Sequence, residues 1–488
     1  MTAATSLRVL PLDGKTTVGT YFVSNYPPFA GWSKSALDDV RARLDAPPAP
    51  GAPLGVYVHI PFCRKRCRFC YFKVYTERTA SEVGAYVEAL LADARLHARS
   101  PIIAGRKPRF VYFGGGTPSY LSSTELARLL GGLRELMPWD ETEEVTFECE
   151  PGTISEAKLR VLAGEGVTRL SLGVESFDDA VLEANGRAHQ QRQIYQAHEI
   201  ARRVGLPQIN IDLIAGMVGE TDAIWDDTVA RTIALAPDSV TIYQMELPPN
   251  TTIARDLRGA DQADTPVDDW PTKRARVGRA FAAMEAAGYR VSSAYTMVKP
   301  HARFRYRDNL WTGADLLPVG VSSFGHLGGV HLQNEKEIEV YMARVGAGEL
   351  PLQRGYVLST EERLVRELIL QLKLGRVRHA YFREKFGVEL RERFAEPLGA
   401  RADAILRDRQ HQRRAGVPGP DFGGVDLMPV RKLAALQQEI DRRHPRAAIG
   451  SRAIAERFGI MAALGVRLEA EPLDDFAGAM LFEFHQNQ

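Results

Sequence analysis

Three cysteines lie close together in the stretch IPFCRKRCRFCYF, at Cys63, Cys67 and Cys70. Thiols at this spacing form no useful disulfide framework, whereas thiolates are strong metal ligands. A structural zinc ion takes four ligands, usually from two CxxC pairs, so it suits this CxxxCxxC run only if another residue such as His59 completes the set. Cysteine thiolates also hold iron–sulfur clusters, and three of them on a four-iron cluster leave one iron open to a ligand from outside the protein. The spacing alone is compatible with both kinds of metal centre.

Cys149 is the remaining cysteine of the chain. It stands between Glu148 and Glu150 in a run that reads as a strand. Successive side chains of a strand point to opposite faces, so Cys149 faces away from the side to which the two glutamates point. We therefore expect a small buried hydrophobic residue and not a fourth metal ligand. The basic residues of the cysteine loop either offset the charge of a thiolate-bound cluster or are ordinary solvated residues: Arg64, Lys65, Arg66 and Arg68.

The residues that could position this loop begin directly before it. Six short β-rich runs alternate with helix-like stretches, at 55–61, 109–116, 144–151, 169–176, 209–216 and 239–246. The intervening segment 122–137 carries Leu126, Leu129, Leu130 and Leu133 on one helical face. Alternation of strands and helices predicts a parallel sheet, and the nearly continuous apolar runs predict burial of both its faces. The fold class is therefore α/β, either a barrel or a doubly wound sheet.

Polar residues and glycines gather at the carboxyl ends of these runs. In α/β folds of either kind the ligand binds at that edge of the sheet, so we expect one site there. The residues are His59, Gly114 to Thr117, Glu148, Glu150, Glu175, Asp212, Gly216, Gln244 and Glu246.

The chain divides into four predicted parts. They are an extension and Pro-rich linker at 1–54, the strand–helix core at 55–250, a mixed α/β segment at 251–345 that completes the site, and a mainly helical domain at 346–488. In the extension, Tyr26, Phe29 and Trp32 either cover the site or pack in the core. In the last part, Ser359 and Glu362 form a capping box before an apolar stripe of Leu364, Leu368 and Leu372.

The composition sets limits on partners and location. Sixty-two Lys and Arg residues oppose 61 Asp and Glu residues, which leaves a formal charge of +1. This balance provides no broad electrostatic footprint for nucleic acid or an anionic membrane. The N-terminus shows no signal-peptide pattern, and no apolar run approaches membrane-spanning length. We expect a cytoplasmic protein that acts on a small molecule.

The cysteine motif and its surroundings resemble a known family. CxxxCxxC after a strand is similar to the radical S-adenosylmethionine (SAM) superfamily. YVHIPFCRKRCRFC, GGGTPSYL, FECEP, LSLGVESF and NIDLIAG resemble the oxygen-independent coproporphyrinogen III oxidase-like family, over roughly Tyr57 to Tyr341. The resemblance implies a partial (β/α)6 TIM-like barrel, a 4Fe–4S cluster in preference to zinc, and two SAM molecules. It also implies a reductant such as flavodoxin or ferredoxin, and cleavage of SAM to a 5′-deoxyadenosyl radical.

The resemblance assigns expected roles to residues at matching positions. Cys63, Cys67 and Cys70 would ligate the cluster. Tyr57 and His59 would lie beside the cluster and the first SAM, Tyr57 as a SAM contact, and would act with Glu148 as catalytic residues. The remaining expected SAM contacts are Gly114, Gly115 and Thr117 at the methionine amino group, and Glu148, Arg187 and Asp212 at the carboxylate, the ribose or a second SAM.

Two qualifications accompany these roles. A buried strand-end carboxylate needs a partner, so a structural ion pair with a nearby Arg is an alternative to SAM binding. Glu175, also an expected SAM contact, departs from the Gln usual in this motif. A carboxylate accepts hydrogen bonds from ribose hydroxyls but cannot donate them.

Three functions within this family compete. The decarboxylase of heme synthesis commonly has another cysteine directly after the third, whereas Tyr71 and Phe72 follow Cys70 here. The heme-binding chaperone has a histidine near 306–311, where this chain has none; His301, His326 and His331 are candidate replacements.

The third function belongs to the methyltransferase and cyclopropane-forming branch. CRFCYFKVYT and GADLLPVGVSSFGHLGGVHLQN resemble this branch, although Pro318 stands where glycine is usual. The sequence thus favours methyl or methylene transfer to an sp² carbon of an aromatic or heteroaromatic small molecule. The decarboxylase is the runner-up.

Overall fold

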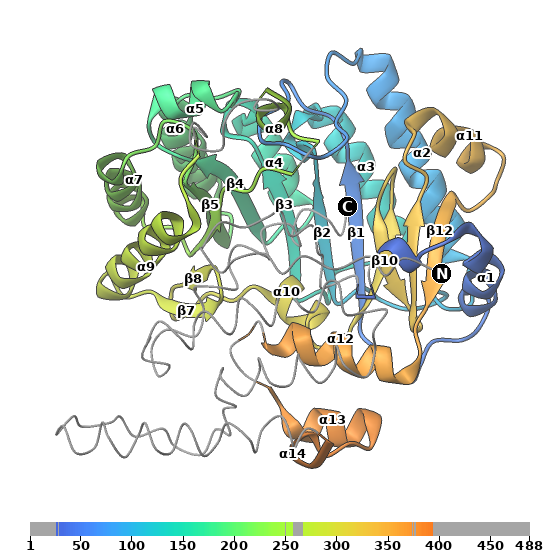
Figure 1. Cartoon of the computed structure of the whole chain (residues 1–488). Coiled ribbons are helices and arrows are strands. Elements are labelled where there is room, and N and C mark those ends of the chain that lie inside the picture. The colour runs from blue at the N-terminus through green and yellow to red at the C-terminus, as the bar shows by residue number, and fades with distance from the viewer. Residues whose placement is uncertain are drawn as a thin grey trace, which may run out of the picture.

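A single mixed sheet forms the centre of the molecule in the computed structural model (Figure 1). The structure describes residues 26–27, 29–248, 250–256, 267–372, 374 and 377–393. The order of the strands in the sheet is β12-β11-β10-β9-β1-β2-β3-β4-β5-β6-β8-β7. The sheet curves but does not close, because the edge strands β12 and β7 do not pair with each other. This is the partial α/β barrel that the sequence predicts.

Six consecutive parallel strands make the middle of the sheet, as predicted. They are β1 (Leu54–Ile60), β2 (Phe110–Gly115), β3 (Glu144–Cys149), β4 (Arg169–Glu175), β5 (Gln208–Ala215) and β6 (Ser239–Gln244). Nearly all their residues are buried, because helices cover one face and the barrel interior encloses the other.

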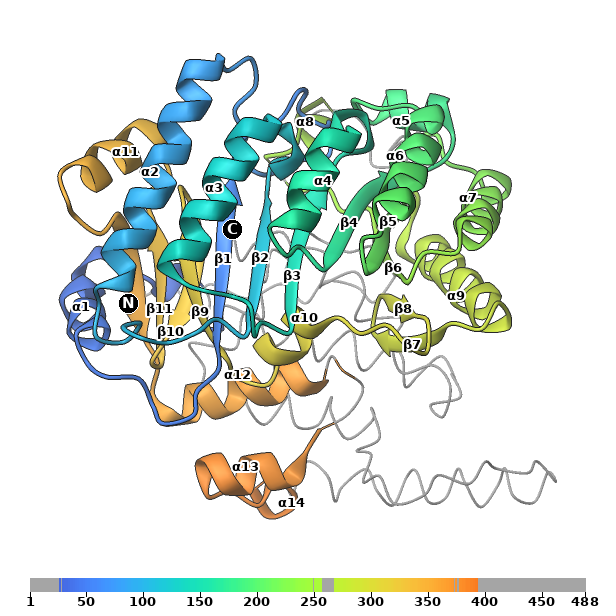
Figure 2. The ribbon, with the colours of Figure 1, turned by 180° about the vertical axis from the view of Figure 1, so that it is seen from behind.

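Helices between these strands cover the outer face of the sheet (Figure 2). They are α2 (Ala80–Ala98), α3 (Ser123–Leu136), α4 (Glu156–Gly164), α5 (Asp179–Ala184), α6 (Gln191–Val204) and α7 (Asp222–Leu235). In α3 the predicted leucine face is buried, and the Ser122 side chain caps the helix by accepting from the Glu125 N–H. The apolar spacing and the cap thus explain where this helix begins and which face it buries.

Further strands extend the sheet on both sides. On one side, β9 (Asp315–Val319) pairs in parallel with β1 and is followed by the antiparallel β10 (Phe324–Leu327), β11 (Val330–Asn334) and β12 (Leu352–Val357). On the other side lie β8 (Thr296–Val298) and β7 (Arg290–Ser293). The remaining helices are α1 (Leu37–Leu44), α8 (Thr252–Asp256), α9 (Trp270–Ala286), α10 (Arg305–Leu310) and α11 (Ile338–Gly346), with short 3-10 turns at Phe29–Gly31, Lys34–Ala36, Pro118–Tyr120 and Pro151–Thr153.

Pro318 lies within β9, opposite Tyr57 of β1. Proline has no N–H to donate to the next strand, and β9 pairs with β10 only through Leu316 and His326. The ring needs space on that side, which Gly325 provides: a Cβ at Gly325 would come within 2.3 Å of the Pro318 ring. The departure from glycine is therefore accommodated by a glycine on the neighbouring strand.

The aromatic residues of the N-terminal extension pack in the core. The Trp32 ring stacks on the His331 ring of β11, with 4.8 Å between the ring centroids. It also packs edge-on against Phe324 of β10, with 5.7 Å between the centroids. Tyr26 is buried, and its carbonyl oxygen is 2.8 Å from His331 Nε2. Of the two interpretations of these residues, the structure supports packing, and residues 1–25 lie outside the described part of the chain.

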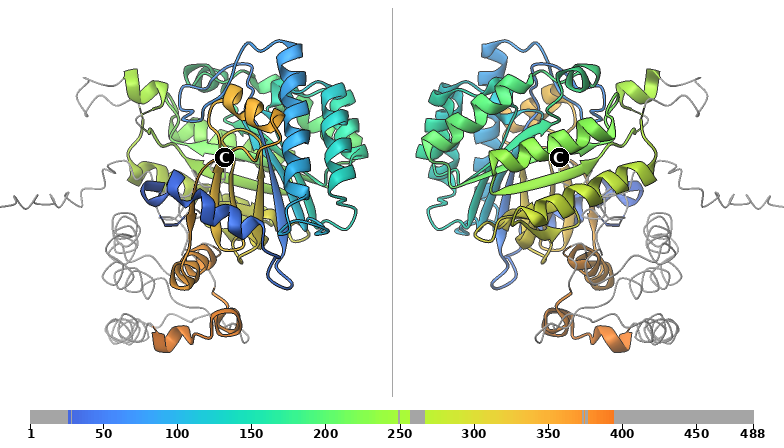
Figure 3. Two further views of the ribbon diagram at one scale, coloured as in Figure 1. Left: turned by 90° about the vertical axis from the view of Figure 1, so that its right-hand side faces the viewer. Right: turned by 90° about the vertical axis from the view of Figure 1, so that its left-hand side faces the viewer.

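The described C-terminal part contains α12 (Thr360–Leu372), α13 (His379–Phe386) and α14 (Leu390–Arg393). Ser359 and Glu362 form the predicted capping box, and Leu364 and Leu368 are buried. The side views place α12 and α13 beneath the amino ends of the parallel strands (Figure 3). The helical prediction for the rest of the segment up to residue 488 falls outside the described residues. None of the helices in the described ranges is long and apolar enough to cross a bilayer.

Candidate active site

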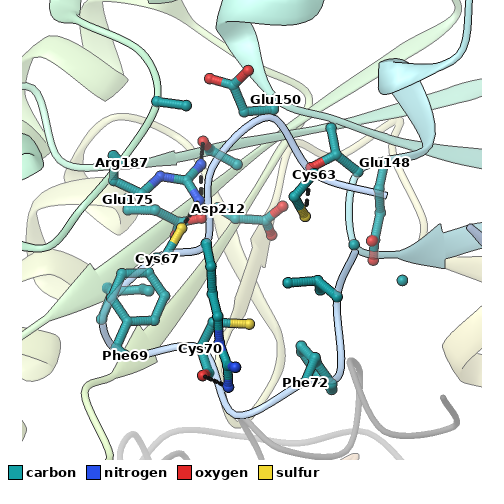
Figure 4. A pocket seen from close by; sticks show the side chains of 18 of the residues that line it. Cys63, Cys67, Phe69, Cys70, Phe72, Glu148, Glu150, Glu175, Arg187 and Asp212 are labelled. Atoms are coloured by element: carbon teal, nitrogen blue, oxygen red, sulfur yellow. Dashed lines mark hydrogen bonds and ion pairs between the residues drawn. The ribbon is translucent and has the colours of Figure 1, made fainter. Parts of the chain in front are cut away.

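A cavity opens at the carboxyl ends of the parallel strands, where the sequence predicts the site (Figure 4). It encloses about 1210 Å³, its open mouth included, which is room for a nucleoside-sized ligand together with a substrate. The cysteine loop between β1 and α2 forms one wall. The other walls come from the carboxyl ends of β2 to β6 and from the segment after α5, with Gly115 to Thr117, Glu148 to Glu150, Glu175, Arg187, Asp212 and Tyr243 to Glu246.

All three loop cysteines line this cavity. The Thr117 hydroxyl donates to Cys63 Sγ at 3.4 Å, and the Arg187 guanidinium donates to Cys67 Sγ at the same distance. Within the loop, the Cys70 N–H donates to the Cys67 carbonyl at 3.1 Å, and Arg66 holds the Cys70 carbonyl at 3.0 Å. The loop therefore has a defined shape that turns its sulfurs toward the cavity.

Burial raises the pKa of the Cys63 thiol to about 12, and it raises the pKa of the Cys70 thiol to about 12 as well. Near neutral pH both thiols are therefore protonated unless a cationic metal centre takes the place of the protons. Across the described residues, no three His, Cys, Asp or Glu side chains converge on a point suited to one metal ion. All three thiols face the same cavity, and cysteine thiolates are the usual ligands of iron–sulfur clusters.

Cys149 is buried and belongs to the hydrophobic core cluster, as predicted. It reaches the edge of the cavity, but burial raises its pKa even further above the ordinary range than those of the loop cysteines. In this environment the thiol is protonated and apolar in character.

The glycines after β2 bring the backbone close to the cysteine loop. Gly115 has φ of +123°, and a Cβ there would lie 2.6 Å from the Ile60 carbonyl oxygen. A Cβ at Gly116 would lie 2.9 Å from Cys63 Sγ. Gly115, Gly116 and Thr117 line the cavity, whereas Gly114 lies within β2 opposite His59. The glycines thus let the backbone approach the cysteine loop closely, as a ledge for an amino group would require; that role stays a prediction.

Tyr57 and His59 are buried in the barrel interior and do not line the cavity. The Tyr57 hydroxyl is 3.4 Å from His59 Nδ1. Burial lowers the pKa of His59 to about 3, so the imidazole is neutral. Its Nε2 is buried without a hydrogen-bond partner. The predicted roles of these two residues at the cluster and SAM stay predictions.

The predicted carboxylates hold defined partners. Tyr112 donates to Glu148 Oε1 at 2.5 Å, while Ser171 and Asn210 donate to the two oxygens of Asp212 at 2.8 Å each. Glu175 has φ of +65° and forms an ion pair with Arg187 at 3.6 Å. Glu175 thus forms the ion pair with a nearby arginine that the sequence analysis gave as the alternative to SAM binding.

Glu150 is paired with a histidine that the sequence did not single out. Glu150 Oε1 lies 2.8 Å from His189 Nδ1 and accepts from the Gly152 N–H at 3.1 Å. Burial raises the pKa of Glu150, but the hydrogen bond from His189 outweighs it, and the net pKa is lowered. Glu150 Oε2 and Arg187 Nε are buried without a partner, so the cavity wall has polar atoms left for a bound ligand.

Several cavity residues were not predicted. Phe69 lies inside the cysteine motif itself, so its position was a usable signal, and Tyr71 and Phe72 follow directly. Ser171 and Tyr243 alternate with predicted neighbours on β4 and β6, which becomes visible only once the register is known. The structure also brings together Cys63, Cys67, Cys70, Gly115, Thr117, Glu148, Glu175, Arg187 and Asp212 around one cavity.

Comparison with known proteins agrees with this geometry. The model of the radical SAM superfamily matches residues 57–231. The oxygen-independent coproporphyrinogen III oxidase of Escherichia coli (strain K12) is 30% identical over 364 residues, which cover 72% of this chain and 78% of that protein. The heme chaperone HemW of Bacillus subtilis (strain 168) is 27% identical over 338 residues, which cover 68% of this chain and 87% of that protein.

A solved structure described as coproporphyrinogen III oxidase from Escherichia coli, a radical SAM enzyme, superposes with a TM-score of 0.67 and 27% identity. The superposition covers 79% of this chain and 90% of the chain in that structure. The fold and the cysteine loop thus define a radical SAM enzyme, whose cofactors are a 4Fe–4S cluster and SAM. Within that superfamily, the chain belongs to the oxygen-independent coproporphyrinogen III oxidase family.

Proposed function

We propose that this enzyme oxidatively decarboxylates a propionate-bearing porphyrinogen-type substrate, the runner-up of the sequence analysis. The observation that carries the proposal is the 30% identity to a coproporphyrinogen III oxidase over 72% of this chain. No comparison reported above supports the methyltransferase branch in the same way. The similarity to these relatives therefore favours decarboxylation over methyl transfer, whereas the residues after Cys70 favoured the opposite order.

In this proposal Cys63, Cys67 and Cys70 hold the cluster, which with SAM supplies a 5′-deoxyadenosyl radical for hydrogen abstraction. The Thr117 hydroxyl and the Arg187 guanidinium stabilise the thiolate forms of Cys63 and Cys67 by donating to sulfur. Gly115 and Gly116 let the backbone approach the ligand closely, because side chains there would clash with the cysteine loop.

The carboxylates of the cavity wall suit a cationic cofactor. Five of them, from Glu148, Glu150, Glu175, Asp212 and Glu246, stand against four basic side chains, from Arg64, Lys65, Arg66 and Arg187. SAM carries a sulfonium and an ammonium group, and carboxylates in a partly dehydrated cavity offset such charges strongly. Glu148 and Asp212 both line the cavity, and a carboxylate can accept up to about four hydrogen bonds. Both are thus placed to accept from SAM.

Aromatic residues of the loop, Phe69, Tyr71 and Phe72, line the same cavity. They exclude water from the cavity, which protects a reactive radical from side reactions. Tyr71 and Phe72 stand where the decarboxylase commonly has a further cysteine, and this observation favours a second candidate function, methyl or methylene transfer to an sp² carbon. It would use a second SAM as donor.

A heme-chaperone function receives less support. Among the described residues that line the cavity there is no histidine. His326 and His331 are buried, and their Nδ1 atoms lie 3.3 Å apart in the β10–β11 hairpin. The side chain of His301 is exposed and lies 2.9 Å from Asp238 at the amino end of β6. None of the three candidate replacements therefore faces the site.

The products of SAM separate the two enzymatic candidates. Reconstituted enzyme is reduced anaerobically and incubated with SAM and coproporphyrinogen III. Decarboxylation yields 5′-deoxyadenosine, carbon dioxide and a vinyl product, without S-adenosylhomocysteine. If S-adenosylhomocysteine accumulates and no carbon dioxide is released, the decarboxylase proposal is wrong and methyl transfer takes its place.

A further inference from the structure

Arg187 connects one of the loop cysteines to a carboxylate. Its guanidinium donates to Cys67 Sγ at 3.4 Å and to the Gly173 carbonyl oxygen at 2.5 Å. The second of these nitrogens also lies 3.6 Å from Glu175 Oε1. Figure 4 shows the arginine beside Cys67 and Glu175, on the wall of the cavity. A single side chain thus touches both a predicted cluster ligand and an acidic group.

The local backbone is built to hold this arrangement. Strand β4 has an irregular register between Gly173 and Glu175, at the end that faces the cavity. Glu175 adopts φ of +65°, a left-handed conformation that is uncommon for a residue with a side chain. Strain of this kind at a cavity wall points to a function for the residue that carries it.

Gly173 leaves the space that the ion pair occupies. A Cβ at this position would lie 3.0 Å from Glu175 Oε1 and 3.2 Å from the Arg187 nitrogen that contacts it. Both side chains of the pair are largely buried, each with 11% of its surface exposed. Charges at this depth are weakly screened, so each one acts on its neighbours.

We infer that Glu175 sets the reduction potential of the cluster by neutralising the cation that Arg187 brings to Cys67. A hydrogen bond and a positive charge at a cluster sulfur stabilise the reduced form and raise the potential. Glu175 offsets the charge while Arg187 keeps its hydrogen bond. The pair thereby keeps the potential low, which favours electron transfer to SAM. This inference rests on the cluster assignment of the proposed function but not on the reaction that follows.

Glu175 is a positioning residue in this account, and the test measures a potential instead of activity. Wild-type enzyme and variants are reconstituted anaerobically, their iron content is determined, and the cluster is titrated potentiometrically by EPR without SAM. Omitting SAM separates this role from a direct contact between Glu175 and the ligand. Glu175→Gln should shift the midpoint potential to a more positive value, because it removes the negative charge at nearly constant shape.

Arg187→Gln should shift the midpoint potential in the opposite direction, and the double variant should fall between the two single variants. Glu220→Gln is the matched control. Glu220 is also buried and pairs with an arginine, Arg276, at 2.9 Å, but neither residue lines the cavity. This control should leave the potential unchanged.

Fully loaded Glu175→Gln enzyme with the wild-type potential would overturn the inference and leave the proposed function intact. If that variant does not retain iron, Arg187→Gln decides: a potential that fails to move to a more negative value overturns the inference too. A wild-type chain that takes up no iron would instead refute the cluster assignment, and with it both proposals.

Discussion

The two ends of the parallel strands carry similar residues and use them differently. At the amino end, Glu144 accepts from the Arg305 and Tyr306 N–H groups that begin α10 and from the Thr146 hydroxyl. Asp238 at the same end accepts from Arg202 and from the Ile209 N–H. These carboxylates hold neighbouring elements in place.

At the carboxyl end the carboxylates line a cavity. Glu148 accepts from Tyr112, and Glu175 is held in a left-handed backbone conformation beside Arg187. Buried polar atoms without a partner occur at both ends, with Glu150 Oε2 at the carboxyl end and Arg169 Nε at the amino end. Comparison of the two ends shows that neither residue type nor hydrogen bonding alone separates a structural carboxylate from one at the cavity; its place on the strand does.

Removal of a proposed cluster ligand at the carboxyl end should have the largest effect, because the cluster and SAM cleavage are lost together. Loss of an outer partner of a metal ligand alone costs about 10–100-fold, so Cys67→Ala should lower SAM cleavage by more than about 100-fold. The measurement is iron content together with 5′-deoxyadenosine formation. Cys149→Ala is the matched control, because Cys149 is buried in the core, and it should retain the cluster. Full iron in the Cys67 variant would refute the ligand assignment.

Substitution of a carboxylate at the amino end of the parallel strands should lower the stability of the fold. Glu144→Ala leaves two N–H groups of α10 without their acceptor and should lower the free energy of unfolding by about 1–3 kcal/mol. Glu148→Gln, at the other end of the same strand, should change it by less than about 1 kcal/mol while SAM cleavage falls. Chemical denaturation of both variants tests this contrast. A reversed order of stabilities would remove the distinction between the two ends.

Thr117 should have a smaller effect than a ligand. Thr117→Ala removes the hydroxyl that donates to Cys63 Sγ, and SAM cleavage should fall by about 10-fold. Thr117→Ser keeps the hydroxyl and should retain most of the activity. Equal activity of the alanine and serine variants would show that this hydrogen bond is unimportant.

The smallest expected effect is a change in the pH dependence of unfolding, caused by Asp238 at the amino end of β6. Burial raises the pKa of Asp238, but its hydrogen bonds with the Ile209 N–H, His301 and Arg202 lower the net value below the ordinary 3.8. A depressed carboxyl pKa stabilises the fold above the unfolded-state pKa, and this stability is lost as the pH falls through the folded-state pKa. Unfolding measured from pH 5 to pH 2 should therefore show a shallower acid loss in Asp238→Asn than in the wild type. Parallel curves would contradict this.

Much of the fold could be predicted, since parallel strands buried on both faces leave long apolar runs in the sequence. The leucine face of α3 and the capping box of Ser359 and Glu362 follow from local rules that the tertiary structure preserves. The short strands β7 to β12 carry less signal, because three to six residues define no clear period.

The site could be predicted only in part. The cysteine spacing and the polar strand ends are local, whereas the pairing of Glu150 with His189 depends on how β3 and the segment after α5 meet. Tyr57 and His59 are buried on β1 and are not among the residues that line the cavity, and their roles beside the cluster and SAM stay predictions.

We propose that Cys63, Cys67 and Cys70 hold a four-iron cluster whose remaining iron binds SAM. The most direct test is the EPR spectrum of anaerobically reconstituted, reduced protein before and after addition of SAM, with metal analysis of the same sample. We expect about four irons per chain and a spectrum that changes when SAM is added, as an open iron requires. Zinc without iron, or a cluster whose spectrum is indifferent to SAM, would contradict the claim.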